Sequence, residues 1–222
     1  MTDISTSTST ITDTSTVTII GSGAMAAAIG IRAAKNGHTV ELMSRSAAKA
    51  EALAAEIGRG TTVGTYGARP AGDIVIVAVL FAGAVEVVTH FGDALAGKTI
   101  VDITNPFNAD GSGLATTAGD SVAERMAAVA PDGAHVVKAL NTLFGGVIAA
   151  DTGVDALFAG DGDGDGAESK ARVAGFIESL GLRPLDAGGL EMAHALEWAG
   201  LLLVGVARNG VGFDVALGVE AV

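Results

Sequence analysis

The sequence predicts an α/β protein built on a doubly wound, mostly parallel sheet that is covered by helices on both faces. Patterns typical of strands and helices alternate along most of the chain, which indicates parallel strands joined by helices. The strand patterns are continuous apolar runs, as expected for strands buried on both faces. A glycine-rich turn joins the first strand to the first helix, which is typical of a Rossmann-like dinucleotide-binding domain.

The first strand, residues 17–20, leads directly into this turn. The turn is Gly21-Ser22-Gly23-Ala24-Met25-Ala26. Gly21 permits a tight turn, Gly23 lets the backbone approach a pyrophosphate, and Ala26 is small enough for close packing of helix on strand. The following helix directs its unpaired N–H groups and the positive end of its dipole toward the pyrophosphate. We therefore expect a dinucleotide site at this turn.

The end of the second strand indicates which dinucleotide is bound. NAD-binding proteins usually place Asp or Glu about 20 residues after the turn, where it binds the ribose hydroxyls. In this chain the strand 39–43 ends in Ser44 and Arg45, and Lys49 follows one helical turn later. A guanidinium and an ammonium bind a 2′-phosphate, which a carboxylate would repel. These residues predict NADP(H); the alternative is a solvated Arg and Lys at a helix start.

The remaining elements follow in order along the chain. Helices are expected at 46–57, 83–91, 121–130, 166–180 and 190–208, and strands at 61–65, 73–79, 98–103, 135–140, 155–159 and 182–186. Ser121 and Glu124 form a capping box, and Pro106 forces a turn after the strand 98–103. The polar stretch 107–119 is expected to be a loop.

The carboxyl ends of these strands define the predicted active site. In an open parallel sheet, ligands bind beyond the carboxyl ends of the strands. These ends are Gly21-Ser22-Gly23, Ser44-Arg45, Leu80-Phe81, Thr104-Asn105-Pro106 and Asn141-Thr142. We therefore expect the five segments to line one crevice.

Composition limits the domain organisation and the partners. The 222 residues fit a single domain, 17–222, whose end (187–222) forms a helical extension, after a Ser/Thr-rich tail, 1–16, that is expected to be disordered. The tail lacks the features of a targeting peptide, so a cytoplasmic location is expected. The absence of cysteine excludes disulfides and thiolate chemistry. The net charge of −12 argues against nucleic acid and membrane as partners.

The segment 196–206 (LEWAGLLLVGV) is apolar nearly all round. Such a helix is buried, either within its own chain or against a second copy. We expect a homodimer formed through this helix.

Other polar residues have competing interpretations. The stretch 161–166 (DGDGDG) starts like a calcium loop, but a solvated acidic turn before a helix explains it better. Glu191, His194 and Glu197 share a helix face without the spacing of a known metal motif, so no metal is expected. Lys138 either meets an acidic group of a substrate or pairs with a carboxylate such as Asp102. His38 and His90 fall at helix ends and are expected at the surface.

The chain resembles the NADPH-dependent reductases of deazaflavin coenzyme F-420, the F-420:NADP oxidoreductase family. The resemblance covers almost everything after residue 16 and rests on the glycine turn, on Ser44-Arg45 with Lys49, and on four later segments. These segments are VDITNP (101–106), VVKALNT (136–142), LDAGGLEMAHALE (185–197) and RNGVGFDVALG (208–218).

The resemblance implies a role for each matched segment. Residues 21–25 would hold the pyrophosphate, and Ser44, Arg45 and Lys49 the 2′-phosphate. The residues implied around the nicotinamide are Leu80, Phe81, Asn105, Pro106, Ala139, Leu140, Asn141 and Thr142, and Val79 is also expected to bind the cofactor. Hydride would pass directly between the nicotinamide and the F-420 ring stacked on it, so alignment matters more than an acid or base, and no catalytic residue is assigned.

Two departures keep other acceptors open. Leu80 stands where the family commonly has Pro, and Leu140-Asn141-Thr142 where the established deazaflavin reductases have a His-containing segment. The alternatives are an NADPH-dependent reductase of a flavin or of a small imine or carbonyl compound, and a non-catalytic module that senses NADPH.

Overall fold

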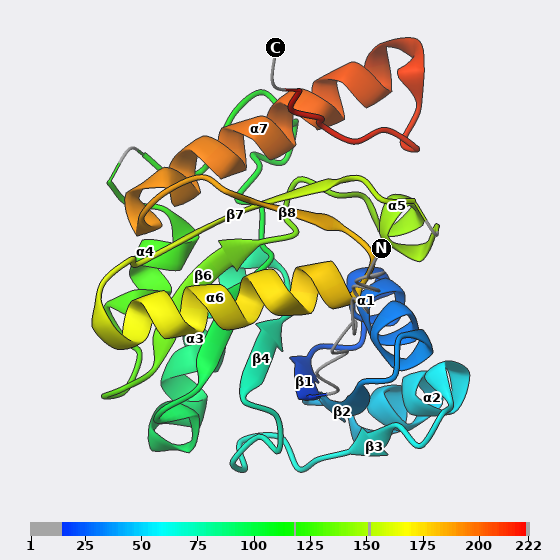
Figure 1. The fold of residues 1–222 in the computed structure, drawn as a ribbon, viewed down its shortest axis with the longest axis vertical. Helices are drawn as coiled ribbons and strands as arrows, with labels where there is room; N and C mark the ends of the chain where they lie inside the picture. Colours follow the sequence, from blue (N-terminus) through cyan, green and yellow to red (C-terminus); the bar gives the residue numbers. More distant parts are fainter. Residues whose placement is uncertain (1–14, 118, 151, 221–222) are drawn as a thin grey trace, which may run out of the picture.

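The computed structural model describes residues 15–117, 119–150 and 152–220. These residues form one eight-stranded sheet in the order β3-β2-β1-β4-β5-β6-β7-β8, with helices on both faces (Figure 1). All pairs are parallel except β6 with β7, which are antiparallel. The predicted fold class, a doubly wound and mostly parallel Rossmann-like sheet, is confirmed.

The first part of the chain forms the centre and one edge of the sheet. Its elements are β1 (Thr16–Ile20), α1 (Ala24–Lys35), β2 (Thr39–Met43), α2 (Ala47–Ile57) and β3 (Thr62–Val63). At the carboxyl end of β1, Ile20 lies between Met43 of β2 and Val77 of the next strand. The chain reverses its direction across the sheet here, because β2 and β3 lie on one side of β1 and all later strands on the other. Such a switch point is where ligands bind in this architecture.

The second part extends the sheet on the other side. Its elements are β4 (Ile74–Val77), α3 (Phe81–Phe91), η1 (Gly92–Leu95), β5 (Thr99–Asp102), α4 (Val122–Ala127), β6 (His135–Ala139) and α5 (Gly145–Ala149). The last elements are β7 (Asp155–Gly160), α6 (Gly164–Ser179), β8 (Arg183–Asp186), η2 (Leu190–Met192), α7 (Ala193–Val206) and η3 (Ala207–Val211). Ser121 caps α4, and both hydrogen bonds of the expected capping box are present.

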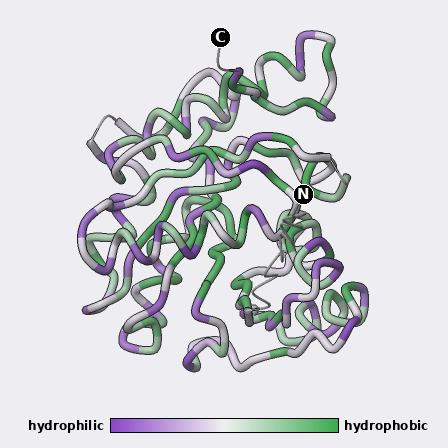
Figure 2. Tube along the Cα trace, viewed as in Figure 1, coloured by the Kyte–Doolittle hydropathy of each residue, from purple (hydrophilic) through white to green (hydrophobic). Residues whose placement is uncertain are grey.

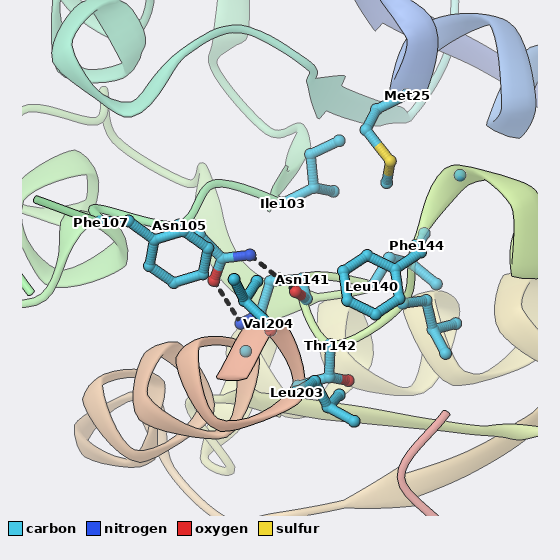
Figure 3. A pocket seen from close by; sticks show the side chains of 13 residues that line it. Met25, Ile103, Asn105, Phe107, Leu140, Asn141, Thr142, Phe144, Leu203 and Val204 are labelled. Atoms are coloured by element: carbon cyan, nitrogen blue, oxygen red, sulfur yellow. Dashed lines mark hydrogen bonds between the residues drawn. The ribbon is translucent and has the colours of Figure 1, made fainter. Parts of the chain in front are cut away.

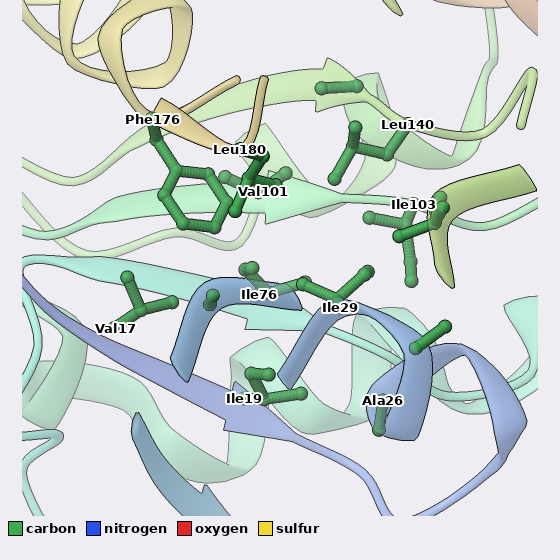
Figure 4. Packing of buried hydrophobic residues seen from close by; sticks show 14 of the residues in the cluster. Val17, Ile19, Ala26, Ile29, Ile76, Val101, Ile103, Leu140, Phe176 and Leu180 are labelled. Atoms are coloured by element: carbon green, nitrogen blue, oxygen red, sulfur yellow. The ribbon is translucent and has the colours of Figure 1, made fainter. Parts of the chain in front are cut away.

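Two hydrophobic clusters cover the two faces of the sheet. One joins the sheet to α1, α2, α5 and α6 (Figure 4), and the other joins it to α3, α4 and the start of α7. Residues of β4 alternate between the clusters, since Ile74 and Ile76 belong to the first and Val75 and Val77 to the second. Figure 2 shows hydrophobic residues running through the central strands, as expected for a sheet buried on both faces.

Several boundaries differ from those expected. Thr16 already belongs to β1, and residues 1–14 of the expected tail lie outside the described part of the chain. The helix α3 begins at Phe81, two residues earlier than expected, because Leu80 serves as its N-cap residue. The short helix α5 was not expected, since a segment of five residues is too short to show helical periodicity.

The expectation for His38 was wrong. Its side chain is 5% exposed, its Nε2 lies 2.6 Å from Ser179 Oγ, and its ring meets Phe176 edge to face. The sequence pattern around His38 did not indicate that α6, some 140 residues later, covers this helix end. His90 is exposed, as expected.

The helix α7 is buried on one side only. Leu196, Gly200 and Leu203 face the protein, whereas Trp198 (49% exposed), Leu202 (61%) and Val206 (38%) lie on the outside. Within the described residues, the helical stretch Leu190–Val211 is long and apolar enough to cross a membrane by length and composition. Helices that pack against the core of a globular protein meet the same criterion.

Candidate functional site

The glycine turn after β1 is shaped for an anion. Gly21 has φ +142°, and a Cβ atom there would lie 2.1 Å from the carbonyl oxygen of Ala78, so the turn requires glycine. A Cβ atom on Gly23 would instead point into open space, with no atom within 4 Å. Gly23 is the N-cap residue of α1, and no side chain caps this helix. The turn therefore offers backbone N–H groups and the positive end of the helix dipole to a ligand.

A pocket of about 390 Å³, here called the nucleotide pocket, opens beside this turn at the switch point. Its walls come from the carboxyl ends of β1, β2 and β4, from α3 and from the loop after β3. The lining residues are Ile20, Gly21, Ser22, Ser44, Arg45, Tyr66, Ala78, Val79, Leu80, Ala82, Gly83, Glu86 and Val87.

Two hydroxyl groups and two cations line the nucleotide pocket and the groove next to it. The Oγ atoms of Ser22 and Ser44 lie 3.3 Å apart, and Arg45 lines the pocket beside them. Ser22 also lines a second groove of about 360 Å³, which it shares with Gly23 and Lys49. Arg45 thus lines the pocket that contains both serines, and Lys49 lines the groove that contains Ser22, a set of donors that suits a phosphate monoester.

A second, mostly apolar pocket of about 190 Å³ lies between the same sheet edge and α7 (Figure 3). We call it the acceptor pocket. It is bounded by the start of α1, the segments after β5 and β6, the start of α5 and one face of α7. The lining residues are Met25, Ile103, Asn105, Phe107, Leu140, Asn141, Thr142, Leu143, Phe144, Gly145, Gly200, Leu203 and Val204.

A pair of asparagines fixes the floor of the acceptor pocket. Asn105 Nδ2 donates to the backbone oxygen of Asn141 (2.7 Å), and Asn141 Nδ2 donates to Asn105 Oδ1 (3.0 Å) (Figure 3). Asn141 Nδ2 also donates to the backbone oxygen of Leu196 (2.8 Å). The pair thus ties the segments after β5 and β6 to α7. Leu140 has φ +58°, a conformation that is uncommon for a non-glycine residue and often found at functional sites.

Behind this floor lies a fully buried cluster of charged residues. Lys138 Nζ donates to Asp102 Oδ2 (2.8 Å) and to the backbone oxygen of Thr104 (2.5 Å), and lies 3.5 Å from Glu197 Oε1. The side chains of Lys138, Asp102 and Glu197 are all 0% exposed. Of the two roles considered for Lys138, the structure shows the pairing with Asp102. The cluster joins β5, β6 and α7 below the acceptor pocket.

The polar residues considered for metals have other partners. Glu197 accepts hydrogen bonds from Thr116 Oγ1 (2.9 Å) and from the backbone N–H of Val122 (3.0 Å). His194 Nε2 accepts from Trp198 Nε1 (3.1 Å). Across the described ranges, no group of three or more His, Asp or Glu side chains could hold a metal ion. The acidic stretch 161–166 runs into the start of α6.

The structure brings most of the expected site residues to these three hollows. The exceptions are Phe81, Pro106 and Ala139, which line none of them. Ala139 is fully buried in β6, and Phe81 packs against the hydrophobic cluster on its side of the sheet. A strand-end position does not tell which way a side chain points, because successive side chains of a strand face opposite sides.

Sequence reasoning missed two groups of lining residues. Tyr66 and Glu86 line the nucleotide pocket, and Gly200, Leu203 and Val204 of α7 line the acceptor pocket. Tyr66 could have been found, because it closely follows the expected short strand 61–65 and so lies near the same sheet edge. The part played by α7 depends on packing between distant segments, for which the sequence contains no local signal.

Comparison with known proteins agrees with this arrangement. Residues 16–106 match the model of the family described as NADP oxidoreductase, coenzyme F420-dependent. The matched residues include β1 to β5, and therefore the whole nucleotide pocket. The family resemblance seen in the sequence is confirmed for residues 16–106.

Solved structures share the fold over most of the chain. A hypothetical protein of Sinorhizobium meliloti, SMa0349, is 29% identical, with a TM-score of 0.70 over 79% of this chain and 86% of that one. A protein of Arthrobacter sp. FB24 assigned as an F420-dependent NADP reductase is 22% identical, with a TM-score of 0.78 over 93% of this chain and 100% of that one.

Similarity also extends to a larger enzyme. The reductive aminase of Aspergillus terreus, in complex with NADPH4, cyclohexanone and allyl amine, is 26% identical to this chain, with a TM-score of 0.60. The match covers 87% of this chain but only 61% of the aminase. Together the comparisons place the chain among NADP-dependent oxidoreductases.

Proposed function

We propose that this chain, whose residues 16–106 belong to the coenzyme F420-dependent NADP oxidoreductase family, transfers hydride between NADP(H) and the deazaflavin coenzyme F-420. The observation that carries the proposal is the acceptor pocket. It adjoins the glycine turn through Met25 of α1 and offers about 190 Å³ of mostly apolar space to a second ring beside a bound nicotinamide.

The residues of the nucleotide pocket fit NADP(H). Gly23 leaves open space for a pyrophosphate, and Ser22, Ser44, Arg45 and Lys49 surround a position for the 2′-phosphate. When bound, NADPH supplies the hydride. We propose that four further residues expected at the cofactor, Asn105, Leu140, Asn141 and Thr142, surround the nicotinamide; all four line the acceptor pocket.

The lining of the acceptor pocket favours a particular kind of acceptor. None of its described lining residues is titratable at neutral pH. The apolar walls exclude water, and the asparagine pair aligns the reactants without giving a proton. Such a pocket suits an acceptor that takes the hydride directly at an electrophilic ring atom or carbon: a carbon in a deazaflavin or an iminium ion, and the nitrogen N5 in a flavin. A carbonyl compound also requires a proton donor at its oxygen, so it fits less well.

An iminium acceptor is the second candidate. The likeness to the reductive aminase, which covers 87% of this chain, favours it. A non-catalytic NADPH sensor is the third, but a sensor does not require the acceptor pocket.

Turnover assays distinguish these functions. The protein is mixed with NADPH and, in separate reactions, with F-420, FMN, FAD, cyclohexanone plus allyl amine, or no acceptor, and the loss of NADPH absorbance is followed. We expect oxidation of NADPH with F-420. Oxidation only with the ketone and amine would support the iminium candidate. Tight binding of NADPH without turnover of any acceptor would contradict the reductase proposal and favour the sensor.

We further propose a cytoplasmic homodimer formed through the exposed side of α7. Trp198, Leu202 and Val206 recur at every fourth position there and form an apolar stripe. Light scattering coupled to size exclusion should give the mass of two chains for the wild type and of one chain for Leu202→Lys. A monomeric wild type would contradict this part of the proposal.

A further inference from the structure

Tyr66 is the single tyrosine of the chain and has no assigned role. It lies in the loop after β3, is partly buried, and lines the nucleotide pocket together with Arg45 and Glu86. Its ring is stacked on His90, with centroids 4.9 Å apart and planes at 20°. Phe91 meets it edge to face, with centroids 5.1 Å apart. Two consecutive residues of α3 thus hold the ring in one orientation at the pocket wall.

The neighbouring glycine makes this stacking possible. Gly67 has φ +89°, and a Cβ atom at this position would lie 2.9 Å from His90 Nε2. A larger residue would therefore be strained and would push the imidazole away from Tyr66. The tyrosine, the glycine and the histidine together form a supported aromatic surface in the pocket.

Charges of opposite sign lie around the hydroxyl of Tyr66. Burial raises the pKa of this hydroxyl, the Arg45 guanidinium lowers it, and the Glu86 carboxylate raises it, with a net increase. The hydroxyl therefore stays protonated at neutral pH. The pocket lining thus includes a cation, an aromatic ring and a carboxylate. Adenosine 2′-phosphate offers complementary groups: an anion, a flat base and an exocyclic amino group that donates hydrogen bonds.

We propose that Tyr66 determines specificity for the base of the nucleotide: its ring packs against the adenine of NADP(H), and Glu86 accepts a hydrogen bond from the adenine amino group. His90 is a positioning residue that acts through Tyr66. This inference rests on the proposed function, because it takes the nucleotide pocket to hold NADP(H). Packing of a base on an aromatic ring strengthens binding by about 10-fold or more.

The first experiment measures the adenosine half alone. Wild type, Tyr66→Ala, Tyr66→Phe and Tyr66→Leu are titrated with 2′,5′-ADP, which carries the base and the 2′-phosphate but no nicotinamide. We expect the dissociation constant to rise about 10-fold in the Ala and Leu variants and to stay near the wild-type value in the Phe variant. The Leu variant fills the space of the ring without its π face, so it serves if the Ala variant does not fold.

Kinetics separate a role in binding from a structural one. In Tyr66→Ala we expect KM for NADPH to rise and kcat to remain unchanged. His90→Phe should retain wild-type values because it can still stack, whereas His90→Ala should raise KM. Thr65→Ala, which changes an exposed neighbour of Tyr66, is the matched control and should change neither constant.

The proposed hydrogen bond from the adenine amino group to Glu86 is tested with an NADPH analogue that carries hypoxanthine in place of adenine. Wild type should prefer the adenine form by about 10-fold, and Glu86→Ala should lose this preference.

If wild type binds 2′,5′-ADP and the Tyr66→Ala and Tyr66→Leu variants bind it equally well, the inference about Tyr66 is wrong and the proposed function stands. If wild type binds neither 2′,5′-ADP nor NADPH, the proposed function itself is wrong.

Discussion

The nucleotide pocket and the acceptor pocket lie at the same edge of one sheet, yet different parts of the chain build them. All residues of the nucleotide pocket fall between Ile20 and Val87, within consecutive strand–helix units. The acceptor pocket uses segments from Met25 to Val204. Its floor depends on contacts across long stretches of chain, such as Asn141 with Leu196 and Thr116 with Glu197.

This difference separates two kinds of constraint. The nucleotide pocket is shaped by backbone conformation, as at Gly21, and by exposed charges, as at Arg45. The acceptor pocket is held by buried polar groups whose partners must all be present. We therefore expect substitutions in the first to change mainly binding, and substitutions behind the second to change stability as well.

The largest effect is expected behind the acceptor pocket. Lys138→Met leaves Asp102 and Glu197 buried without their cation, which should lower the free energy of unfolding by about 3–5 kcal/mol. Denaturant unfolding measures this change. Arg125→Met, which breaks an exposed pair with Asp120, is the control and should cost about 0–1 kcal/mol. Equal losses in the two variants would contradict a special role for the buried cluster.

Two substitutions in the glycine turn should have separate effects, one on stability and the other on the binding of NADPH. In Gly21→Ala the methyl group overlaps the carbonyl of Ala78, so we expect a loss of stability of about 2–5 kcal/mol from strain and overlap. In Gly23→Ala the methyl group meets no protein atom, so stability should be kept while affinity for NADPH falls. Thermal unfolding and NADPH titration measure both properties. Unchanged NADPH affinity in Gly23→Ala would contradict a pyrophosphate at this turn.

The charge beside the serine pair should discriminate between dinucleotides. Arg45→Ala should weaken the binding of NADPH relative to that of NADH by about 1.5–3 kcal/mol, the range for a charge-assisted hydrogen bond. Titration with both nucleotides measures the difference. Arg59→Ala removes an exposed cation just beyond the end of α2, outside the nucleotide pocket, and should affect neither nucleotide. If Arg45→Ala weakened the binding of NADPH and of NADH equally, Arg45 would not recognise the 2′-phosphate.

The same contrast explains what the sequence revealed. The glycine turn, the strand ends and the Ser44-Arg45 pair could be identified because each is a local signal: a backbone requirement, an apolar run or a charge at a known distance. The fold class follows from the same local patterns, repeated along the chain. The glycine turn and the Ser44-Arg45 pair lie in the part of the chain that matches the family model.

The acceptor pocket was less predictable for physical reasons. The left-handed conformation of Leu140 has no signature in its residue type, since glycine is the usual occupant of such positions. Gly200 matters because Asn105 lies close to it. The pairing of Lys138 depends on the carboxylate that α7 brings near it, that of Glu197. These are consequences of tertiary packing, which local patterns do not encode.

Two glycines of α7 test this packing directly. A Cβ atom on Gly200 would lie 2.8 Å from Asn105 Oδ1, whereas one on Gly205 would meet nothing within 4 Å. Gly200→Ala should displace the asparagine pair and lower kcat/KM for the acceptor about 10-fold, equivalent to about 1.4 kcal/mol, with NADPH affinity unchanged. Gly205→Ala should leave activity intact and stabilise the helix by up to about 1 kcal/mol. Equal activity of the two variants would show that Asn105 does not shape the acceptor pocket.

The smallest effect concerns the contacts that hold the C-terminal tail against β7 and β8. Arg183 donates to both carboxylate oxygens of Asp155, which also accepts from the backbone N–H of Val219. The hydrogen bonds from Arg183 lower the pKa of Asp155 below its ordinary value of 3.8. Because the pKa is lower in the folded protein, the carboxylate stabilises the fold above pH 3.8, and this contribution is lost as the pH falls through the folded pKa.

The link between protonation of Asp155 and stability is tested by measuring the free energy of unfolding of wild type and of Asp155→Asn at several pH values. Wild type should be the more stable at pH 7. The difference should shrink as the pH falls from about 4, where Asp155 of the unfolded chain takes up a proton, through the lower pKa of Asp155 in the folded protein. Asp120→Asn is the matched control: Arg125 also lowers the pKa of Asp120, but this ion pair is exposed, so its contribution should be small at every pH. A difference between wild type and Asp155→Asn that stays constant down to pH 2 would mean that the shape of the side chain, and not its charge, holds the tail.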